Sequence, residues 1–167
     1  MSVNRAKKFE KIILSCWEET VGTWIYRLYD VMNGNKGVRN VSDFLAYKMP
    51  IMYVIEAKSI QKNTFPCNFR QYEDMKKLYD KHIQGIEIGV IVWFIDHEKV
   101  VYIPIETFIR LVEDGKKSFN IKMLESNEYD HIVIDSVIQR VYPLLDFKSF
   151  VKKIEEKHLC YMYLRVV

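Results

Sequence analysis

The sequence predicts an α/β sandwich in which helices flank a central mixed sheet. A helical pattern opens the chain, short runs rich in aromatic and β-branched residues follow, and further helical patterns alternate with later runs of that kind. This order, αβββαββα with later additions, is typical of helices packed on a mixed sheet. At 167 residues, 49% of them hydrophobic, the chain suits one packed domain.

The first part of the chain predicts one helix and three strands. Residues 3–20 carry apolar side chains at helical spacing, which predicts an amphipathic helix. The run Trp24–Tyr29 predicts a strand, and the glycine- and asparagine-rich segment after it predicts a loop. The apolar runs Val41–Tyr47 and Ile51–Lys58 are separated by a short segment with a proline, which predicts a β-hairpin whose second strand is central.

The remaining elements follow from the same patterns and from the residues that stop them. In chain order they are a loop over Lys62–Cys67, a helix over Asn68–Ile83 with Asn68 as its N-cap and Gly85 after its end, strands over Ile88–Ile95 and Val100–Ile103, a helix over Glu106–Glu113, a short helical stretch after Ser118, an apolar segment around His131–Tyr142, and a final helix over Asp146–Lys157. No repeat or low-complexity tract marks a second domain.

The composition argues against several classes of protein. No run approaches the about 18 apolar residues of a membrane helix, and the N-terminal pattern is not that of a signal peptide, so we expect a soluble intracellular protein without a membrane partner. The cysteines show no CxxC pairing and the histidines no HxxxH or HExxH spacing, so any metal is expected to take oxygen ligands. The formal charge of +3 is too small to establish a nucleic-acid partner.

Three charged residues in the predicted hairpin suggest chemistry. Glu56 and Lys58 are two residues apart on a strand, so their side chains leave the same face. A tight turn would place Asp43 opposite Glu56, with Cβ atoms about 5 Å apart. Two carboxylates at that separation repel each other unless a cation lies between them. Mg²⁺, with Mn²⁺ as a substitute, is the expected cation, and the Ala57 carbonyl and a substrate phosphate would complete its ligands.

Such a site suits phosphodiester hydrolysis. The cation would activate water and neutralise charge on phosphorus, while Lys58 would stabilise the same transition state. The competing interpretation is a surface salt bridge at a strand end. Glu10 adds context, because on a helical wheel it lies between Leu14 and Trp17 in the apolar sector, where a carboxylate is costly unless it is paired or metal-linked. Alternatively, Glu10 bends out to water at the helix edge.

Several separated motifs resemble those of the RecU-like Holliday-junction resolvases and their phage-encoded relatives, members of the PD-(D/E)XK nuclease superfamily. They are Phe9-Glu10, Val41-Ser42-Asp43-Phe44, Ile55-Glu56-Ala57-Lys58, Thr64-Phe65-Pro66, Asn68-Phe69, Gln71, Trp93-Phe94, Ile103-Pro104-Ile105 and Gly115-Lys116-Lys117-Ser118. The Asp-x12-Glu-x-Lys spacing also fits. The resemblance covers about residues 5–125.

The resemblance implies a restriction-endonuclease-like sandwich and a single nuclease domain over 1–167, with a core at about 5–125 and an extension at 126–167. It implies a Mg²⁺-dependent endonuclease that cuts branched DNA, above all four-way junctions, as a homodimer in a bacterial or phage-infected cytoplasm. By the same resemblance Glu10, Asp43 and Glu56 bind metal directly or, for Glu10, through water. Lys58 is catalytic, and Gln71 orients Lys58, water or phosphate.

Other residues are candidates for contact with DNA. The basic residues expected to form a phosphate-contacting rim are Arg5, Lys7, Lys8, Lys36, Arg39, Lys62, Lys116 and Lys117. Each of them alone is more typical of a solvated surface charge. The aromatic residues Tyr26, Tyr29 and Phe65 suit either stacking on unpaired bases or, more commonly, core packing.

One departure from the RecU pattern concerns specificity. RecU resolvases carry a long stalk between the early strand and the catalytic aspartate, whereas only Val31–Asn40 fills that interval here. Two alternatives to a junction resolvase therefore stay open. One is a restriction-like or nicking nuclease of the same chemistry, and the other is a non-catalytic DNA-binding protein that modulates recombination.

Overall fold

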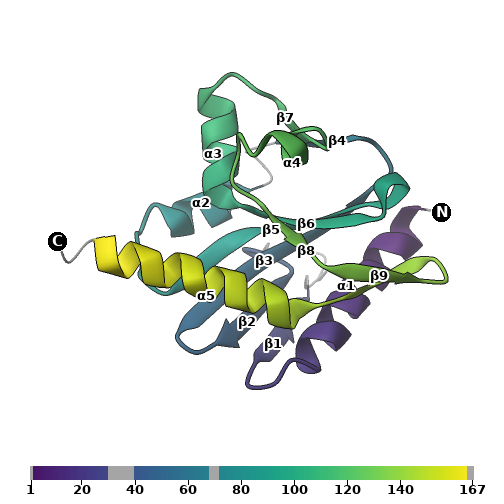
Figure 1. Ribbon diagram of the computed structural model, residues 1–167, viewed down its shortest axis with the longest axis horizontal. Coiled ribbons are helices and arrows are strands. Elements are labelled where there is room, and N and C mark those ends of the chain that lie inside the picture. The colour runs from purple at the N-terminus through teal and green to yellow at the C-terminus, as the bar shows by residue number, and fades with distance from the viewer. Residues whose placement is uncertain (1, 30–39, 68–71, 165–167) are drawn as a thin grey trace, which may run out of the picture.

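The computed structural model describes residues 2–29, 40–67 and 72–164, and it describes side chains within 5–159 of that range. Its central feature is a six-stranded sheet with the strand order β1-β2-β3-β5-β6-β8 (Figure 1). Neighbouring strands are antiparallel except for the parallel pair β3 and β5, so the sheet is mixed. The predicted α/β architecture, a central mixed sheet flanked by helices, is confirmed.

The bounds of the elements are as follows. The six strands of the central sheet are β1 (Trp24–Arg27), β2 (Phe44–Lys48), β3 (Ile51–Ile60), β5 (Ile86–Phe94), β6 (Lys99–Pro104) and β8 (Ile132–Ile134). Two small sheets pair β4 (Thr64–Pro66) with β7 (Ser118–Asn120) and β9 (Ser136–Gln139) with β10 (Tyr142–Leu145). The helices are α1 (Ser2–Glu18), α2 (Glu73–Tyr79), α3 (Ile105–Glu113), α4 (Met123–Ser126), α5 (Phe147–Leu164) and the 3-10 turn η2 (Ile95–His97).

Helices α1 and α5 cover one face of the sheet. Phe9, Ile13 and Trp17 recur at helical spacing on α1 and are almost fully buried. The Trp17 ring lies 4.8 Å from that of Phe147 and 6.1 Å from that of Phe150, both at the start of α5. Each such side chain contributes about 1.5–3 kcal/mol by leaving water. This cluster fixes the position of α1, and therefore of Glu10, against the sheet.

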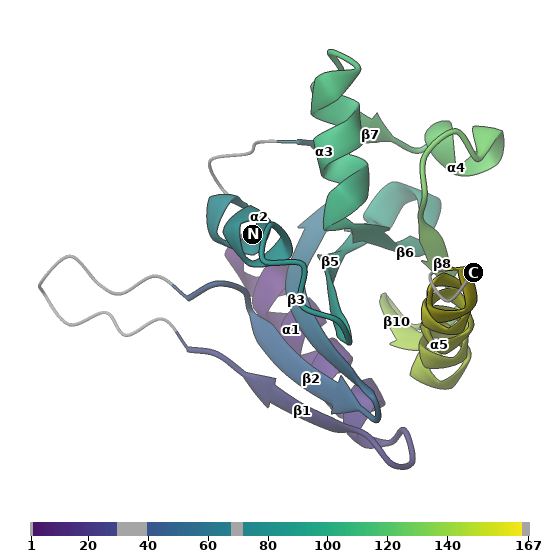
Figure 2. The ribbon, with the colours of Figure 1, turned by 90° about the vertical axis from the view of Figure 1, so that its left-hand side faces the viewer.

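Helices α2 and α3 cover the opposite face (Figure 2). Because side chains alternate along a strand, β5 sends Ile91 and Trp93 to the α1 side and Val90 and Val92 to the α2 and α3 side. The strand is thus apolar on both faces, as a central strand must be. The side chains around β5 are closely packed at Gly89 too, because a Cβ at this position would lie 2.5 Å from the Tyr102 ring.

Two predicted boundaries are wrong. Within the described residues, the helix predicted over Asn68–Ile83 covers Glu73–Tyr79, and Tyr72 is its N-cap residue; Asn68 lies outside the described residues. It ends early because His82 and then Gly85 adopt positive φ, which a right-handed helix does not allow. The loop predicted over Lys62–Cys67 contains strand β4, whose Phe65 pairs with Phe119 of β7 and is buried.

The segment after residue 126 is part of the same core. Strand β8 pairs with β6 in the central sheet, and Phe150, Val151 and Ile154 of α5 are buried with the α1 cluster. The final helix is longer than the predicted Asp146–Lys157.

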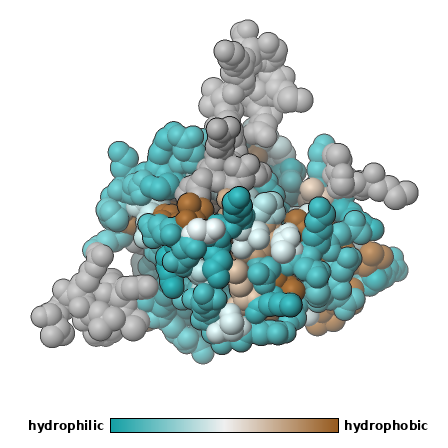
Figure 3. Space-filling view, turned by 90° about the horizontal axis from the view of Figure 1, so that it is seen from above, coloured by the Kyte–Doolittle hydropathy of each residue, from teal (hydrophilic) through white to brown (hydrophobic). Residues whose placement is uncertain are grey.

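Figure 3 shows the α3 and α4 side of the molecule, where hydrophilic side chains predominate. Within the described residues, no helix combines the length and apolarity needed to cross a membrane.

Candidate active site

The hairpin of β2 and β3 has the register on which the predicted site depends. Its pairs run from Lys48 with Ile51 to Phe44 with Ile55, so one residue further along Asp43 faces Glu56. The Ala57 amide donates a 2.8 Å hydrogen bond to Oδ2 of Asp43, which holds the carboxylate against β3. The Leu28 amide donates to the Asp43 carbonyl oxygen at 2.8 Å and ties the segment to the end of β1.

Glu56 and Lys58 share one face of β3, as their spacing predicts. This is the face of Val54, opposite to the one covered by α1. Nζ of Lys58 lies 2.5 Å from Oε1 of Glu56, and the two side chains are 28% and 14% exposed. Because β2 begins only at Phe44, this part of β3 is paired with β5 alone among the described residues. On the side of Asp43, no described strand occupies the edge of β3.

Glu10 approaches this group from α1. Its carboxylate forms an ion pair with Arg27 of β1, and its side chain is 15% exposed. Burial raises the pKa of Glu10 above its ordinary value, the Arg27 guanidinium opposes that shift, the Asp43 carboxylate adds to it, and the Lys58 ammonium opposes it. The pKa of Glu10 therefore depends on the charges of both Asp43 and Lys58. Glu10 thus lies in the apolar sector of α1, as expected, and not in the alternative position turned out to water, because Arg27 holds it in the interface between α1 and the sheet.

Arg27 is a site residue that sequence reasoning missed. Ile25 is buried against α1, and Arg27 is two residues further along the same strand, so it faces α1 as well. Its guanidinium also lies over the Tyr29 ring, 5.0 Å from the centroid. The alternation Ile25-x-Arg27 was a usable signal, because the predicted strand placed a cation on the face that receives Glu10.

The arrangement suits a hard cation in part. Within the described residues, no group of three or more His, Cys, Asp or Glu side chains is gathered as a complete metal site. A carboxylate has about four lone-pair positions, so the bond from the Ala57 amide leaves Asp43 further acceptor capacity. The N–H and C=O of one strand residue point to the same side, so the Ala57 carbonyl points toward Asp43 as well. Asp43, Glu56 and the Ala57 carbonyl thus form an oxygen-rich set, as Mg²⁺ prefers.

The remaining predicted site residues differ in their surroundings. Gln71, Lys36 and Arg39 lie outside the described residues. Arg5 and Lys7 lie on α1, where Arg5 is partly buried and Lys7 exposed. Lys62 and Lys117 are exposed, Lys62 just after β3, and the Lys117 carbonyl accepts a 3.0 Å hydrogen bond from the Cys67 amide.

Two predicted rim residues contact other parts of the chain. Nζ of Lys8 lies over the Tyr142 ring of β10, 4.0 Å from its centroid. Nζ of Lys116 lies 3.8 Å from a carboxylate oxygen of Glu128 and 5.8 Å from the Tyr129 centroid. Both ammonium groups are therefore directed toward the C-terminal segment of the chain.

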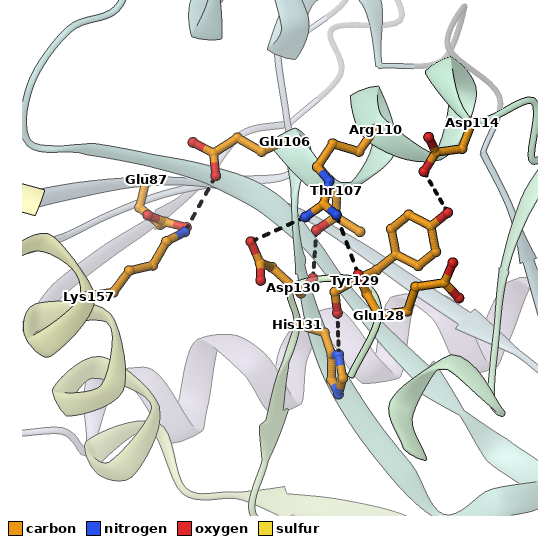
Figure 4. Close-up of polar contacts among 10 residues, drawn as sticks. All are labelled: Glu87, Glu106, Thr107, Arg110, Asp114, Glu128, Tyr129, Asp130, His131 and Lys157. Carbon is orange, nitrogen blue, oxygen red and sulfur yellow. Dashed lines mark hydrogen bonds and ion pairs between the residues drawn. The ribbon is translucent and has the colours of Figure 1, made fainter. Parts of the chain in front are cut away.

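Two hollows lie away from the candidate site residues. A groove of about 1400 Å³ lies near the start of β3 and β5 and is lined by parts of α2, α3 and α5. A smaller one of about 440 Å³ lies beside Tyr129, Asp130 and His131. Figure 4 shows polar contacts that border both, including Lys157 with Glu106 and Arg110 with Asp130. The candidate site is thus an open strand edge and not a deep pocket.

Fold and site together define an α/β protein with helices on both faces of a mixed sheet, as expected of a restriction-endonuclease-like sandwich, and with an Asp, a Glu-x-Lys pair and a helix-borne Glu beside its central hairpin. No protein-family model and no curated protein matches the chain. A solved structure that resembles it is the Holliday junction resolvase Hjc of the archaeal hyperthermophile Archaeoglobus fulgidus, at 17% identity and a TM-score of 0.46 over 60% of this chain and 76% of that one. A likeness of that extent assigns no role to any residue here.

Proposed function

We propose that the chain is a metal-dependent DNA endonuclease of the PD-(D/E)XK type, and more closely a RecU-like resolvase that cuts four-way or other branched DNA as a homodimer in the cytoplasm. The observation that carries the proposal is the hairpin register, which brings the Asp43 carboxylate to the Ala57 amide beside Glu56 and Lys58. The carboxylates of Asp43 and Glu56, the Ala57 backbone and the Lys58 ammonium thereby lie together at one edge of β3.

Each residue of this group has a task in the proposed reaction. Asp43, Glu56 and the Ala57 carbonyl would hold Mg²⁺, which would supply positive charge to the scissile phosphate and acidify water. Lys58 stabilises the negative charge that grows on the phosphate oxygens and orients the attacking water. Its 2.5 Å contact with Glu56 keeps the ammonium at the site before substrate binds.

Glu10 and Arg27 are proposed to support this site from the α1 side. Their ion pair joins α1 to β1, the strand whose end is tied to Asp43 through the Leu28 amide. Glu10 would contact the cation through water. The partial burial of the pair favours this geometry, because separating the two groups where they are would leave a poorly solvated charge without its partner.

A second candidate function has support from two contacts. Glu56 is paired with Lys58 and Glu10 with Arg27, and such pairs also occur in proteins that only bind DNA. In that case the chain would bind branched DNA without cutting it. A restriction-like or nicking nuclease is the alternative within the same chemistry.

Cleavage of a substrate panel tests the three functions. The purified protein is incubated with labelled four-way junctions, flaps, nicked duplex and linear duplex, each with Mg²⁺, Mn²⁺ or EDTA. A resolvase cuts the junction in paired positions with either metal, and EDTA abolishes the cuts. Equal cutting of linear and branched DNA supports the restriction-like alternative, and binding without cutting of any substrate supports the non-catalytic one.

A further inference from the structure

Two exposed aromatic side chains stand side by side on the edge strand β1. Trp24 is 51% exposed and Tyr26 is 53% exposed. Their rings are nearly parallel, with an interplanar angle of 8° and centroids 6.2 Å apart. Large aromatic groups are seldom left in water without a function, because burying them is strongly favourable.

The pair belongs to a wider uncharged surface on one face of the sheet. Ile25, between the two rings in sequence, is buried under α1, so Trp24 and Tyr26 point to the opposite face. Tyr47 of β2 is paired with Trp24 and is 39% exposed, and Leu45 is paired with Tyr26. We call Trp24, Tyr26 and Tyr47 the aromatic patch.

The aromatic patch and the candidate active site lie on the same sheet face. Tyr26 is paired with Leu45 of β2, and Leu45 is paired with Val54 of β3. Glu56 lies two residues beyond Val54 on β3. Two residues along and two strands across correspond to about 12 Å between the Cα atoms of Tyr26 and Glu56. At about 3.4 Å per nucleotide along a stacked strand, that is three or four nucleotides from a phosphate beside Glu56.

We propose that the aromatic patch binds unpaired nucleobases of DNA whose backbone passes the Asp43, Glu56 and Lys58 group. The inference rests on the proposed function and makes its substrate more specific, namely DNA with splayed or single-stranded nucleotides a few positions from the cut. Aromatic side chains stack on every base, so this contact selects open structure and not sequence. The two nearly parallel rings present their π faces to the bases. The three side chains of the patch are uncharged, so they do not repel the phosphates.

A second copy of this chain is the competing occupant, because β1 is an edge strand and exposed edges invite pairing. Strand β1 has only four residues, and the patch consists of three side chains. A stable dimer normally buries at least about 1200 Å² in total, which is much more than such a patch provides. The contact with DNA bases needs only the two or three rings that are present.

Intrinsic fluorescence tests the proposal directly. Of the three tryptophans, Trp17 and Trp93 are buried and Trp24 is exposed, so quenching by added DNA reports on Trp24. The protein is titrated with oligothymidine and with blunt duplex in EDTA, which prevents cleavage. We expect saturable quenching by oligothymidine, weaker quenching by the duplex, and protection of Trp24 from acrylamide in the single-stranded complex.

Variants separate stacking from simple apolar contact. Trp24→Leu and Tyr26→Leu should each weaken oligothymidine binding about five- to 150-fold in an anisotropy assay, whereas Trp24→Phe should retain most of the affinity. Val137→Ala is the control, since Val137 is an exposed apolar residue of β9 and should have no effect. The proposal is overturned if wild-type fluorescence does not respond to oligothymidine or if Trp24→Leu binds it as tightly as wild type.

Three further outcomes separate this proposal from its alternatives. A concentration-dependent dimer that hides Trp24 from acrylamide without DNA, and that Trp24→Leu abolishes, would also overturn it. Metal-dependent cleavage of four-way junctions without any Trp24 response would contradict the aromatic patch and leave the proposed function intact. Quenching by oligothymidine without cleavage of any substrate would support the patch and contradict the proposed function.

Discussion

At the scale of single residues, the contact between Lys58 and Glu56 is open to two interpretations. It is either a catalytic ammonium held in place or a structural ion pair on a strand. We predict that Lys58→Ala lowers the single-turnover cleavage rate at least about a hundredfold, because the ammonium acts on charge that is present only in the transition state. Lys58→Arg should not restore the full rate, since its planar fork delivers charge differently. A wild-type rate in the alanine variant would assign Lys58 a purely structural role.

The ion pair of Arg27 and Glu10 predicts a loss of stability when one partner is removed. Arg27→Gln leaves the carboxylate without its cation, and we expect the free energy of unfolding to fall by about 1–2 kcal/mol in urea titrations. Glu10→Gln in the same background should recover part of that loss. Lys77→Gln is the control, because its ion pairs with Glu73 and Asp74 are exposed and should contribute much less to stability. An equal loss of stability in Arg27→Gln and Lys77→Gln would contradict the account of Glu10.

At the scale of elements, a buried carboxylate attaches α5 to the sheet. Glu87 of β5 accepts hydrogen bonds from Tyr102 at 2.9 Å and from Nε2 of His158 at 2.8 Å, and Lys157 lies 3.6 Å away. Burial alone would raise the pKa of Glu87. The bond from His158, the charge of Lys157 and the bond from Tyr102 outweigh it and leave the pKa below its ordinary value.

That lowered pKa predicts how stability depends on pH. A carboxyl group whose pKa falls on folding stabilises the fold above its unfolded pKa, and this contribution is lost as the pH falls through the folded pKa. We therefore expect the advantage of wild type over Glu87→Gln in urea unfolding to be greatest at neutral pH and to shrink below about pH 4. A difference that stays constant from pH 7 to pH 3 would show that Glu87 is not bound as a carboxylate.

Some of the elements could be predicted from the sequence and others could not. The hairpin was predictable because two apolar runs flank a turn, and its register followed from the length of that turn. The true end of α2 and the strand β4 were not, because His82 adopts positive φ and Phe65 is buried only through partners elsewhere in the chain. Such long-range contacts leave no local periodicity.

At the scale of the whole molecule, the candidate site and the large groove lie at different ends of β3. Glu56 and Lys58 lie toward its carboxyl end, whereas the groove begins at Ile51. The proximity of Asp43, Glu56 and Lys58 was predictable from strand spacing together with the hairpin register. The partnership of Glu87 with His158, 71 residues apart, was not, because no sequence pattern links a strand to a helix at that distance.

The exposed lysines near the carboxyl end of β3 predict a salt effect. Lys62 follows β3, and Lys117 is joined to Cys67 through its carbonyl, so both are proposed to contact phosphates. The double change Lys62→Ala, Lys117→Ala should reduce the slope of log affinity against log salt for duplex DNA by about two units in Ca²⁺. Lys148→Ala, Lys152→Ala on α5 is the matched control and should leave the slope unchanged. An equal reduction in both double variants would show that DNA does not approach this end of the sheet selectively.

The central claim is that Asp43 and Glu56 hold a catalytic cation, and it is tested most directly by measuring single-turnover cleavage of one labelled four-way junction in Mg²⁺. Asp43→Asn and Glu56→Gln each remove ligand charge without removing volume, and the asparagine oxygen can still accept from the Ala57 amide. Thermal melting and junction binding in Ca²⁺ verify that the variants fold and bind. We predict that wild type cleaves the junction and that each variant cleaves it at least about a hundredfold more slowly, with folding and binding retained. Cleavage near the wild-type rate by either folded variant would contradict the proposed site.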